Sequence, residues 1–196
     1  FRAAPYAEAD ISKVYSPTNS KNLPHGLILT KETYRGQIRI RLLYLETHLG
    51  NANSKAFHYF WRDSLKNESV ILYNGHSGIG RNLNLGYIEQ EQGFKIHMSK
   101  DYQIIFFGSC MPYGYYTQMY FDRKATAEDP KGTKNLDLLV YGKEMYSSNR
   151  EGYQVIRTLT NEMLYSFNFS YKDMVGHNPK NYFGVIGDED NPFLKK

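Results

Sequence analysis

The sequence contains a single cysteine, Cys110, among its 196 residues. One cysteine excludes an internal disulfide and any metal site built from several thiolates. A reducing cytosol is compatible with such a chain, and so is a bacterial periplasm, where many proteins avoid cysteine. Because the sequence begins at Phe1 and not at methionine, we expect that an upstream segment has been removed. The sequence does not show whether that segment was a signal peptide, so the compartment stays open, with a secreted or periplasmic location slightly favoured over a cytoplasmic one.

Long apolar runs and basic runs are also missing. No stretch approaches the roughly 20 apolar residues that a membrane span needs, so we expect no membrane span. The 24 Lys and Arg residues exceed the 20 Asp and Glu residues only slightly, and they are scattered along the chain. A nucleic-acid partner is therefore not expected. The histidines and carboxylates lack the spacing of a metal site or of a two-carboxylate glycosidase, so we expect neither. We expect no other cofactor.

The composition that remains is typical of a globular protein. Hydrophobic residues make up 41% of the chain and charged residues 22%, which allows a packed core. The length fits one domain covering residues 1–196. Tyrosine is abundant, with 18 residues, and favours either broad binding surfaces or half-buried packing; both interpretations stay open.

Four apolar runs predict strands. Residues 37–45 alternate at first and then become apolar throughout. The runs 70–73, 103–107 and 136–141 are short and largely apolar, with Gln103 and Asp137 as exceptions, and predict buried parallel strands. A helix opening near Asn53 or Ser54 should connect the first two strands as a βαβ unit.

The segments around these strands have patterns of their own. Pro112 suits the first turn of a helix, and a capping box at 148–151 predicts a long amphipathic helix from about Arg150 to Phe167. His58 should lie near the exposed face of the first helix. We expect an irregular lead-in over 1–36, a short hairpin around Gly93, a surface loop over 122–135 and an irregular tail over 176–196.

Two of the predicted strands end in residues that carry chemistry. The run 70–73 leads into Asn-Gly-His-Ser-Gly-Ile-Gly, which contains His76, and the run 103–107 leads into Gly-Ser-Cys, which ends at Cys110. The carboxyl ends of neighbouring parallel strands meet at one edge of a sheet. A histidine and a thiol at that edge are the pair that a cysteine nucleophile and its acid–base partner require. A helix starting just after Cys110 would lower the pKa of its thiol.

These two blocks resemble the caspase-like (clan CD) cysteine peptidases. Residues 73–78 (Tyr-Asn-Gly-His-Ser-Gly) and 106–110 (Phe-Phe-Gly-Ser-Cys) look most like the separase and CHAT-domain members of that group, and the resemblance covers roughly residues 37–145. It implies an α/β fold: a caspase-like three-layer sandwich with a mostly parallel sheet flanked by helices on both faces. Where the family usually has glycine directly after the histidine, this chain has Ser77.

The resemblance also implies roles for individual residues. His76 and Cys110 would form a catalytic dyad, and the backbone N–H groups of Ser77, Gly78 and Cys110 would form the oxyanion hole. A substrate pocket would follow the first strand, where this sequence has Glu46, His48 and Asn51. The expected function is cleavage of peptide bonds in a protein or peptide substrate through a thioester acyl-enzyme.

Two other functions are compatible with the same residues. One is a non-catalytic binding module that uses a tyrosine-rich surface on the same fold, because fold does not determine function. The other is a different thiol enzyme, such as an amidase or acyltransferase. A reactive Cys110 thiol would distinguish an enzyme from the binding module. The type of substrate that is converted would distinguish an amidase or acyltransferase from a peptidase.

Overall fold

The structure of the chain is a computed structural model that describes residues 2–5, 26–34, 36–45, 50–144, 150–165, 171 and 183–187. The chain forms two compact units, residues 1–63 and 64–196. The single domain over 1–196 stays a prediction.

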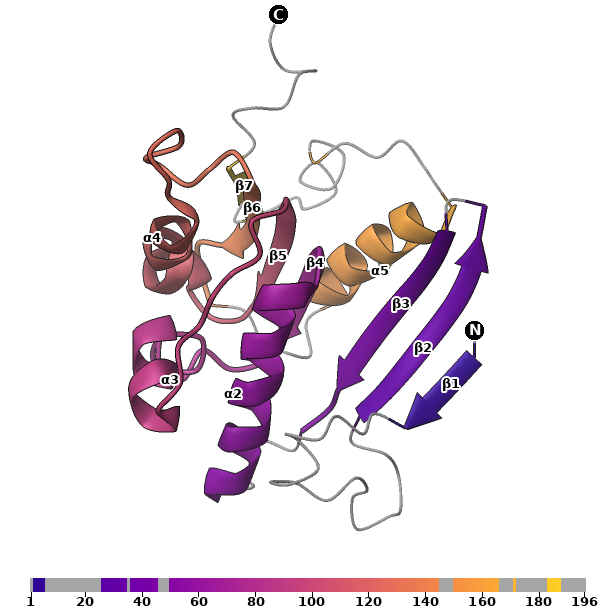
Figure 1. Cartoon of the computed structure of the whole chain (residues 1–196), viewed down its shortest axis with the longest axis horizontal. Coiled ribbons are helices and arrows are strands. Elements are labelled where there is room, and N and C mark those ends of the chain that lie inside the picture. The colour runs from indigo at the N-terminus through magenta and orange to yellow at the C-terminus, as the bar shows by residue number, and fades with distance from the viewer. Residues whose placement is uncertain are drawn as a thin grey trace, which may run out of the picture. The chain divides into compact units, whose positions relative to one another are not determined.

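The first unit contains a three-stranded antiparallel sheet in the order β1-β2-β3, with the strands side by side (Figure 1). Its strands are β1 (Arg2–Pro5), β2 (Gly26–Thr33) and β3 (Gly36–Leu43). A tight turn joins β2 to β3, where Gly36 adopts a φ of 118° and Thr33 donates a hydrogen bond to its carbonyl oxygen at 2.7 Å. The prediction of an irregular lead-in over 1–36 is therefore wrong at β1 and β2, and residues 6–25 of that segment lie outside the described residues. The segment Leu-Ile-Leu-Thr within β2 is a good strand former, and β3 supplies its partner.

The βαβ unit predicted from residues 37–73 is also wrong. β3 pairs in antiparallel fashion with β2 and belongs to a different sheet from β4. The alternation of apolar and charged residues along β3 is the pattern of a half-exposed antiparallel strand, and the adjacent hairpin partner is closer in sequence than any parallel one.

Helix α2 spans Gly50–Asn67 and begins three residues before the predicted opening. In the first unit, Ala56 is buried against Ile28 of β2 together with Tyr59 and Phe60. His58 is only 4% exposed, so its predicted place near an exposed face is wrong.

The second unit is built on a four-stranded mixed sheet in the order β4-β5-β6-β7. The strands are β4 (Val70–Asn74), β5 (Gln103–Gly108), β6 (Leu136–Tyr141) and β7 (Phe183–Ile186). The first three are parallel neighbours, which confirms the three parallel strands expected from the apolar runs. β7 pairs antiparallel with β6, so the prediction of an irregular tail over 176–196 is wrong at this strand.

Helices cover both faces of this sheet, with α4 (Pro112–Lys124) and α5 (Arg150–Tyr165) on opposite sides in Figure 1. On one face, Val155 and Leu159 of α5 pack against a cluster of sheet residues that includes Phe106 and Leu139. On the other face, the ring of Phe107 lies 5.5 Å and 5.0 Å from the rings of Tyr116 and Tyr120 of α4. The successive residues Phe106 and Phe107 of β5 thus face different helices, as strand geometry requires.

The predicted helices at Pro112 and Arg150 are confirmed. α5 ends at Tyr165. Phe167 lies outside the described residues, and so do Ser148 and Asn149 of the predicted capping box. Most of the expected surface loop after 122 is present, because α4 ends at Lys124.

The hairpin predicted around Gly93 is a helix instead, α3 (Leu85–Gln92). Asn84 caps its first turn by accepting the N–H of Tyr87 at 2.9 Å, and Gly93 ends it with a φ of 71°. The glycine that suggested a hairpin turn is therefore a helix C-cap.

Taken together, the elements define an α/β fold with a mixed four-stranded sheet covered on both faces. None of the helices in the described parts of the chain combines the length and apolar character of a membrane span.

Candidate functional site

The ends of β4 and β5 bring the two predicted catalytic residues to one edge of the sheet. Asn74 and Gly108 are the last paired residues of these neighbouring parallel strands. The pairing extends one residue further, because Gly75 donates a backbone hydrogen bond to the Gly108 carbonyl oxygen at 3.0 Å. His76 lies two residues after Asn74, and Cys110 lies two residues after Gly108. They therefore leave the sheet from adjacent strands at its carboxyl edge.

Both side chains are accessible to a ligand. The His76 imidazole is exposed, and the Cys110 side chain is half-buried. Cys110 is followed at once by Met111, the N-cap of α4, and by Pro112 in its first turn. This placement matches the expectation that the thiol lies beside a helix N-terminus, where free N–H groups favour a negative charge.

The backbone of His76 is held in place by side chains. Its carbonyl oxygen accepts hydrogen bonds from the Tyr73 hydroxyl at 2.6 Å and from the Asn82 amide nitrogen at 2.7 Å. Burial raises the pKa of Tyr73 to about 12, so this hydroxyl keeps its proton and stays a donor over the physiological range.

The next carbonyl oxygen along the chain is held in the same way. Ser77 accepts from the Tyr116 hydroxyl of α4 at 2.9 Å and from the backbone N–H of Asn82 at 3.1 Å. Burial raises the pKa of Tyr116 above its ordinary range, so this hydroxyl also stays a donor. Tyr116 of α4 thus holds the loop that carries His76.

These contacts orient the following peptide N–H groups. In a trans peptide, the C=O of one residue and the N–H of the next point in opposite directions, and the described residues contain no cis peptide. Because the carbonyl oxygens of His76 and Ser77 point toward Tyr73, Asn82 and Tyr116, the N–H groups of Ser77 and Gly78 point away from them. Within the described chain, neither N–H has a hydrogen-bond acceptor. Two neighbouring N–H groups of this kind can bind an anion.

The glycines after His76 have the conformations that the loop requires. Gly78 and Gly80 have φ values of 57° and 81°, and Ile79 between them has a φ of 54°. A side chain at Gly78 would collide with Asn82, and a Cβ at Gly80 would lie 2.9 Å from the Tyr115 ring. Glycine at these two positions is therefore required by the conformation of the loop and by its close neighbours.

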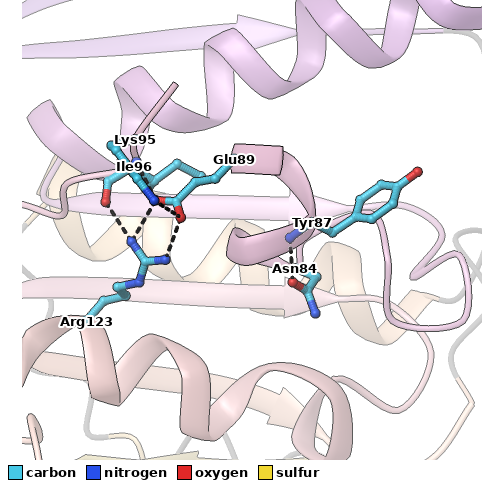
Figure 2. Close-up of polar contacts among 6 residues, drawn as sticks. All are labelled: Asn84, Tyr87, Glu89, Lys95, Ile96 and Arg123. Carbon is cyan, nitrogen blue, oxygen red and sulfur yellow. Dashed lines mark hydrogen bonds and ion pairs between the residues drawn. The ribbon is translucent and has the colours of Figure 1, made fainter. Parts of the chain in front are cut away.

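The helices that follow the two loops are linked to each other. Glu89 of α3 and Arg123 of α4 form a bidentate ion pair, with N···O distances of 2.8 Å and 2.9 Å (Figure 2). The Ile96 N–H donates to Glu89 at 2.8 Å, and the Ile96 carbonyl oxygen accepts from Arg123 at 3.0 Å. The hydrogen bonds from Arg123 lower the pKa of Glu89 to about 2.

The predicted substrate pocket stays a prediction, because its residues are not described together with the candidate dyad. Glu46 and His48 lie outside the described residues, and Asn51 lies in α2, in the other compact unit from His76 and Cys110, with an undescribed side chain. Across the described ranges, no group of three or more His, Cys, Asp or Glu side chains could hold a metal ion.

Sequence reasoning missed the three residues that orient the loop. Tyr73 and Asn82 flank the glycine-rich segment, and Tyr116 belongs to the apolar stripe of α4. The hydrogen bond of Tyr116 to a loop 39 residues away has no local signature in the sequence. For these three residues, the one sequence signal of a role in the loop was the position of Asn82, two residues after Gly80.

Comparisons with protein-family models, with curated proteins and with solved structures find no match to this chain. The fold and the loop geometry are therefore the basis for a functional assignment.

Proposed function

We propose that this chain is a caspase-like cysteine endopeptidase with His76 and Cys110 as its catalytic dyad. The observation that carries the proposal is the register of β4 and β5. Asn74 lies opposite Gly108, and the histidine and the thiol each follow that pair by two residues. Neighbouring parallel strands thus deliver an acid–base group and a nucleophile to one edge, as a thiol peptidase requires.

The chemistry begins with the Cys110 thiolate attacking the carbonyl carbon of the scissile peptide bond. A C–S bond forms, and the negative charge moves to the carbonyl oxygen. The N–H groups of Ser77 and Gly78, which lack acceptors in the described chain, are donors available to this oxyanion. The C–N bond then breaks, and His76 delivers a proton to the leaving amine. Water hydrolyses the resulting thioester, which releases the acid and restores the thiol.

The fold supports the proposal in a second way. Helix α4 starts directly after Cys110, and both faces of the parallel strands are covered by helices. This is the arrangement that a caspase-like sandwich would have around its nucleophile. The three-stranded antiparallel sheet of the first unit is an addition to the expected pattern.

The test is the reactivity of Cys110 together with peptide cleavage. Iodoacetamide should label Cys110 with an apparent pKa well below the free-thiol value of about 8.5. A digest of a peptide library, analysed by mass spectrometry, should show cleavage that Cys110→Ala abolishes, because the chain has no second thiol. His76→Ala should lower the rate by about 10²–10⁴-fold. Ser77→Gly restores the residue usual in the family and should not reduce the rate.

The alternatives make different predictions in the same experiment. A binding module would leave Cys110 labelling only near its free-thiol pKa, and Cys110→Ala would keep the biological activity. The exposed tyrosines Tyr87, Tyr102 and Tyr113 are the observation that favours this reading. A thiol amidase or acyltransferase would label in the same way as a peptidase but leave the peptide library uncut.

A further inference from the structure

Two exposed apolar residues have an unusual backbone conformation beside the candidate dyad. Ile79 and Met111 are the two non-glycine residues with positive φ in the described part of the chain, at 54° and 49°. Ile79 lies three residues after His76, and Met111 directly follows Cys110. Ile79 is 88% exposed and Met111 44% exposed.

The local fold gives no reason for an isoleucine at position 79. A β-branched residue with positive φ is strained, whereas glycine or asparagine adopts this conformation readily. Burial of the side chain usually offsets such strain, but an 88% exposed side chain gains almost nothing from burial. Strain of this kind tends to occur at functional sites, where a side chain has to be presented in one direction.

Contacts link the two residues to one local surface. Gly80, next to Ile79, lies against the ring of Tyr115. Tyr115 in turn donates its backbone N–H to the carbonyl oxygen of Met111 at 3.3 Å. One aromatic residue of α4 therefore connects the loop after His76 with the residue after Cys110.

Charged side chains are absent from both loops. Residues 74–80 and 108–116 contain no Lys, Arg, Asp or Glu. The next charged residue, Arg81, has its guanidinium 5.7 Å from the centre of the Tyr87 ring. Lys143, which follows β6, is an exposed charged residue beside these loops, because its carbonyl oxygen accepts the Met111 N–H at 3.1 Å. Within the two loops themselves, recognition has apolar groups to use and no Lys, Arg, Asp or Glu.

We infer that Ile79 and Met111 form an apolar contact surface that selects peptide substrates with an apolar side chain next to the scissile bond. The inference rests on the proposed peptidase function and adds the substrate class. A peptide that reaches both His76 and Cys110 also passes Ile79 and Met111, because these lie in the same two loops. An apolar substrate side chain loses water contact against them, and an acidic or basic side chain finds no counter-charge in either loop.

Binding can be measured apart from cleavage in the Cys110→Ala protein. Fluorescein-labelled peptide amides, identical except for Leu, Asp or Lys placed at each position in turn, serve as probes, with fluorescence anisotropy as the readout. We expect the best Leu peptide to bind about ten- to hundredfold more tightly than its Asp and Lys counterparts. Adding Ile79→Asn should remove most of this preference and leave the weak binding of the Asp peptide unchanged.

The same substitution should not weaken the fold, because asparagine tolerates positive φ and the lost isoleucine is exposed. The midpoint of thermal unfolding should stay equal or rise by a few degrees. Tyr153→Ala, which removes an exposed apolar residue of α5, is the control and should leave the peptide preference intact.

Three results would overturn the inference: equal affinity for the Leu, Asp and Lys peptides, an Ile79→Asn protein that keeps the Leu preference, or one that unfolds at a lower temperature. An Ile79→Asn change that alters only self-association on gel filtration would identify a second copy as the occupant and would also overturn it. Iodoacetamide labelling of the wild-type thiol tests the peptidase proposal separately. A reactive Cys110 without apolar preference refutes only the inference, and an inert Cys110 with that preference refutes only the peptidase.

Discussion

At the scale of residues, the loop after His76 depends on side-chain donors from outside the loop. Tyr116 and Tyr120 lie one turn apart on α4, and each donates its buried hydroxyl to a carbonyl oxygen at 2.9 Å. The acceptor of Tyr116 is Ser77 beside the candidate histidine, and the acceptor of Tyr120 is Leu83, further along the chain. The two tyrosines therefore have similar structural roles at different distances in sequence from the site.

This pair gives a matched prediction. Tyr116→Phe and Tyr120→Phe each remove one buried hydroxyl group, so each should lower the free energy of unfolding by about 1–3 kcal/mol. Only Tyr116→Phe should also lower kcat for peptide cleavage, because it frees the peptide plane between Ser77 and Gly78. Urea denaturation and steady-state kinetics of both variants test this. Equal activity in the two variants would show that Tyr116 is a packing residue without an effect on the site.

At the scale of elements, α3 and α4 are held together by the ion pair of Glu89 and Arg123. The Glu89 side chain is only 9% exposed, and both of its oxygens face the guanidinium. Lys95 also approaches Glu89, at 3.6 Å, but its side chain is 78% exposed. The two cations thus differ in how much solvent screens their interaction with the same carboxylate.

The ion pair makes stability depend on pH in a defined window. Arg123 lowers the pKa of Glu89 from its ordinary 4.5 to about 2, so the folded state favours the ionised form. The stabilisation is complete above the unfolded pKa and is lost as pH falls from about 4.5 through 2. Arg123→Met should therefore cost about 1–3 kcal/mol near neutral pH, and the difference from wild type should shrink toward pH 2.

Lys95→Met is the control for this measurement. Its exposed ion pair should contribute less than about 1 kcal/mol at any pH. Denaturant unfolding of the wild type and both variants across the acid range checks the prediction. A loss in Arg123→Met that stays constant down to pH 2 would assign its contribution to packing and to the hydrogen bond with Ile96.

At the scale of the whole molecule, the chain is an α/β protein whose second unit has a sheet covered on both faces. All six residues of β6 are buried, as expected of a strand between two helical layers. α5 completes the core on one face through Val155 and Leu159. The antiparallel sheet of the first unit is separate from this sheet.

The contribution of α5 can be measured at Leu159. This side chain is 6% exposed and packs in the cluster with Phe106 and Leu139, so Leu159→Ala should cost about 2–5 kcal/mol of unfolding free energy. Tyr153→Ala on the same helix removes a side chain that is 62% exposed and should change stability by less than about 0.5 kcal/mol. Chemical denaturation of both proteins distinguishes them, and equal losses would contradict the assignment of the buried face.

The sequence by itself determined the parallel core of the second unit. The runs at 70–73, 103–107 and 136–141 are largely apolar, because burial between two helical layers favours apolar residues at most positions of a strand. Gln103 and Asp137 are the exceptions, and both are fully buried. The sequence also located His76 and Cys110, because glycine and the ends of apolar runs are local signals that no distant contact has to supply.

Tertiary structure alone decided the rest. The strand predicted over 37–45 pairs with β2, which the sequence analysis placed in an irregular lead-in, so its antiparallel partner became apparent only in the folded chain. Gly93 serves a hairpin or a helix end equally well until its neighbours are placed. The direction of the Ser77 and Gly78 N–H groups depends on Tyr73, Asn82 and Tyr116, which come from three different segments. Such side-chain to backbone hydrogen bonds leave no periodic pattern in the sequence, so only the folded chain reveals them.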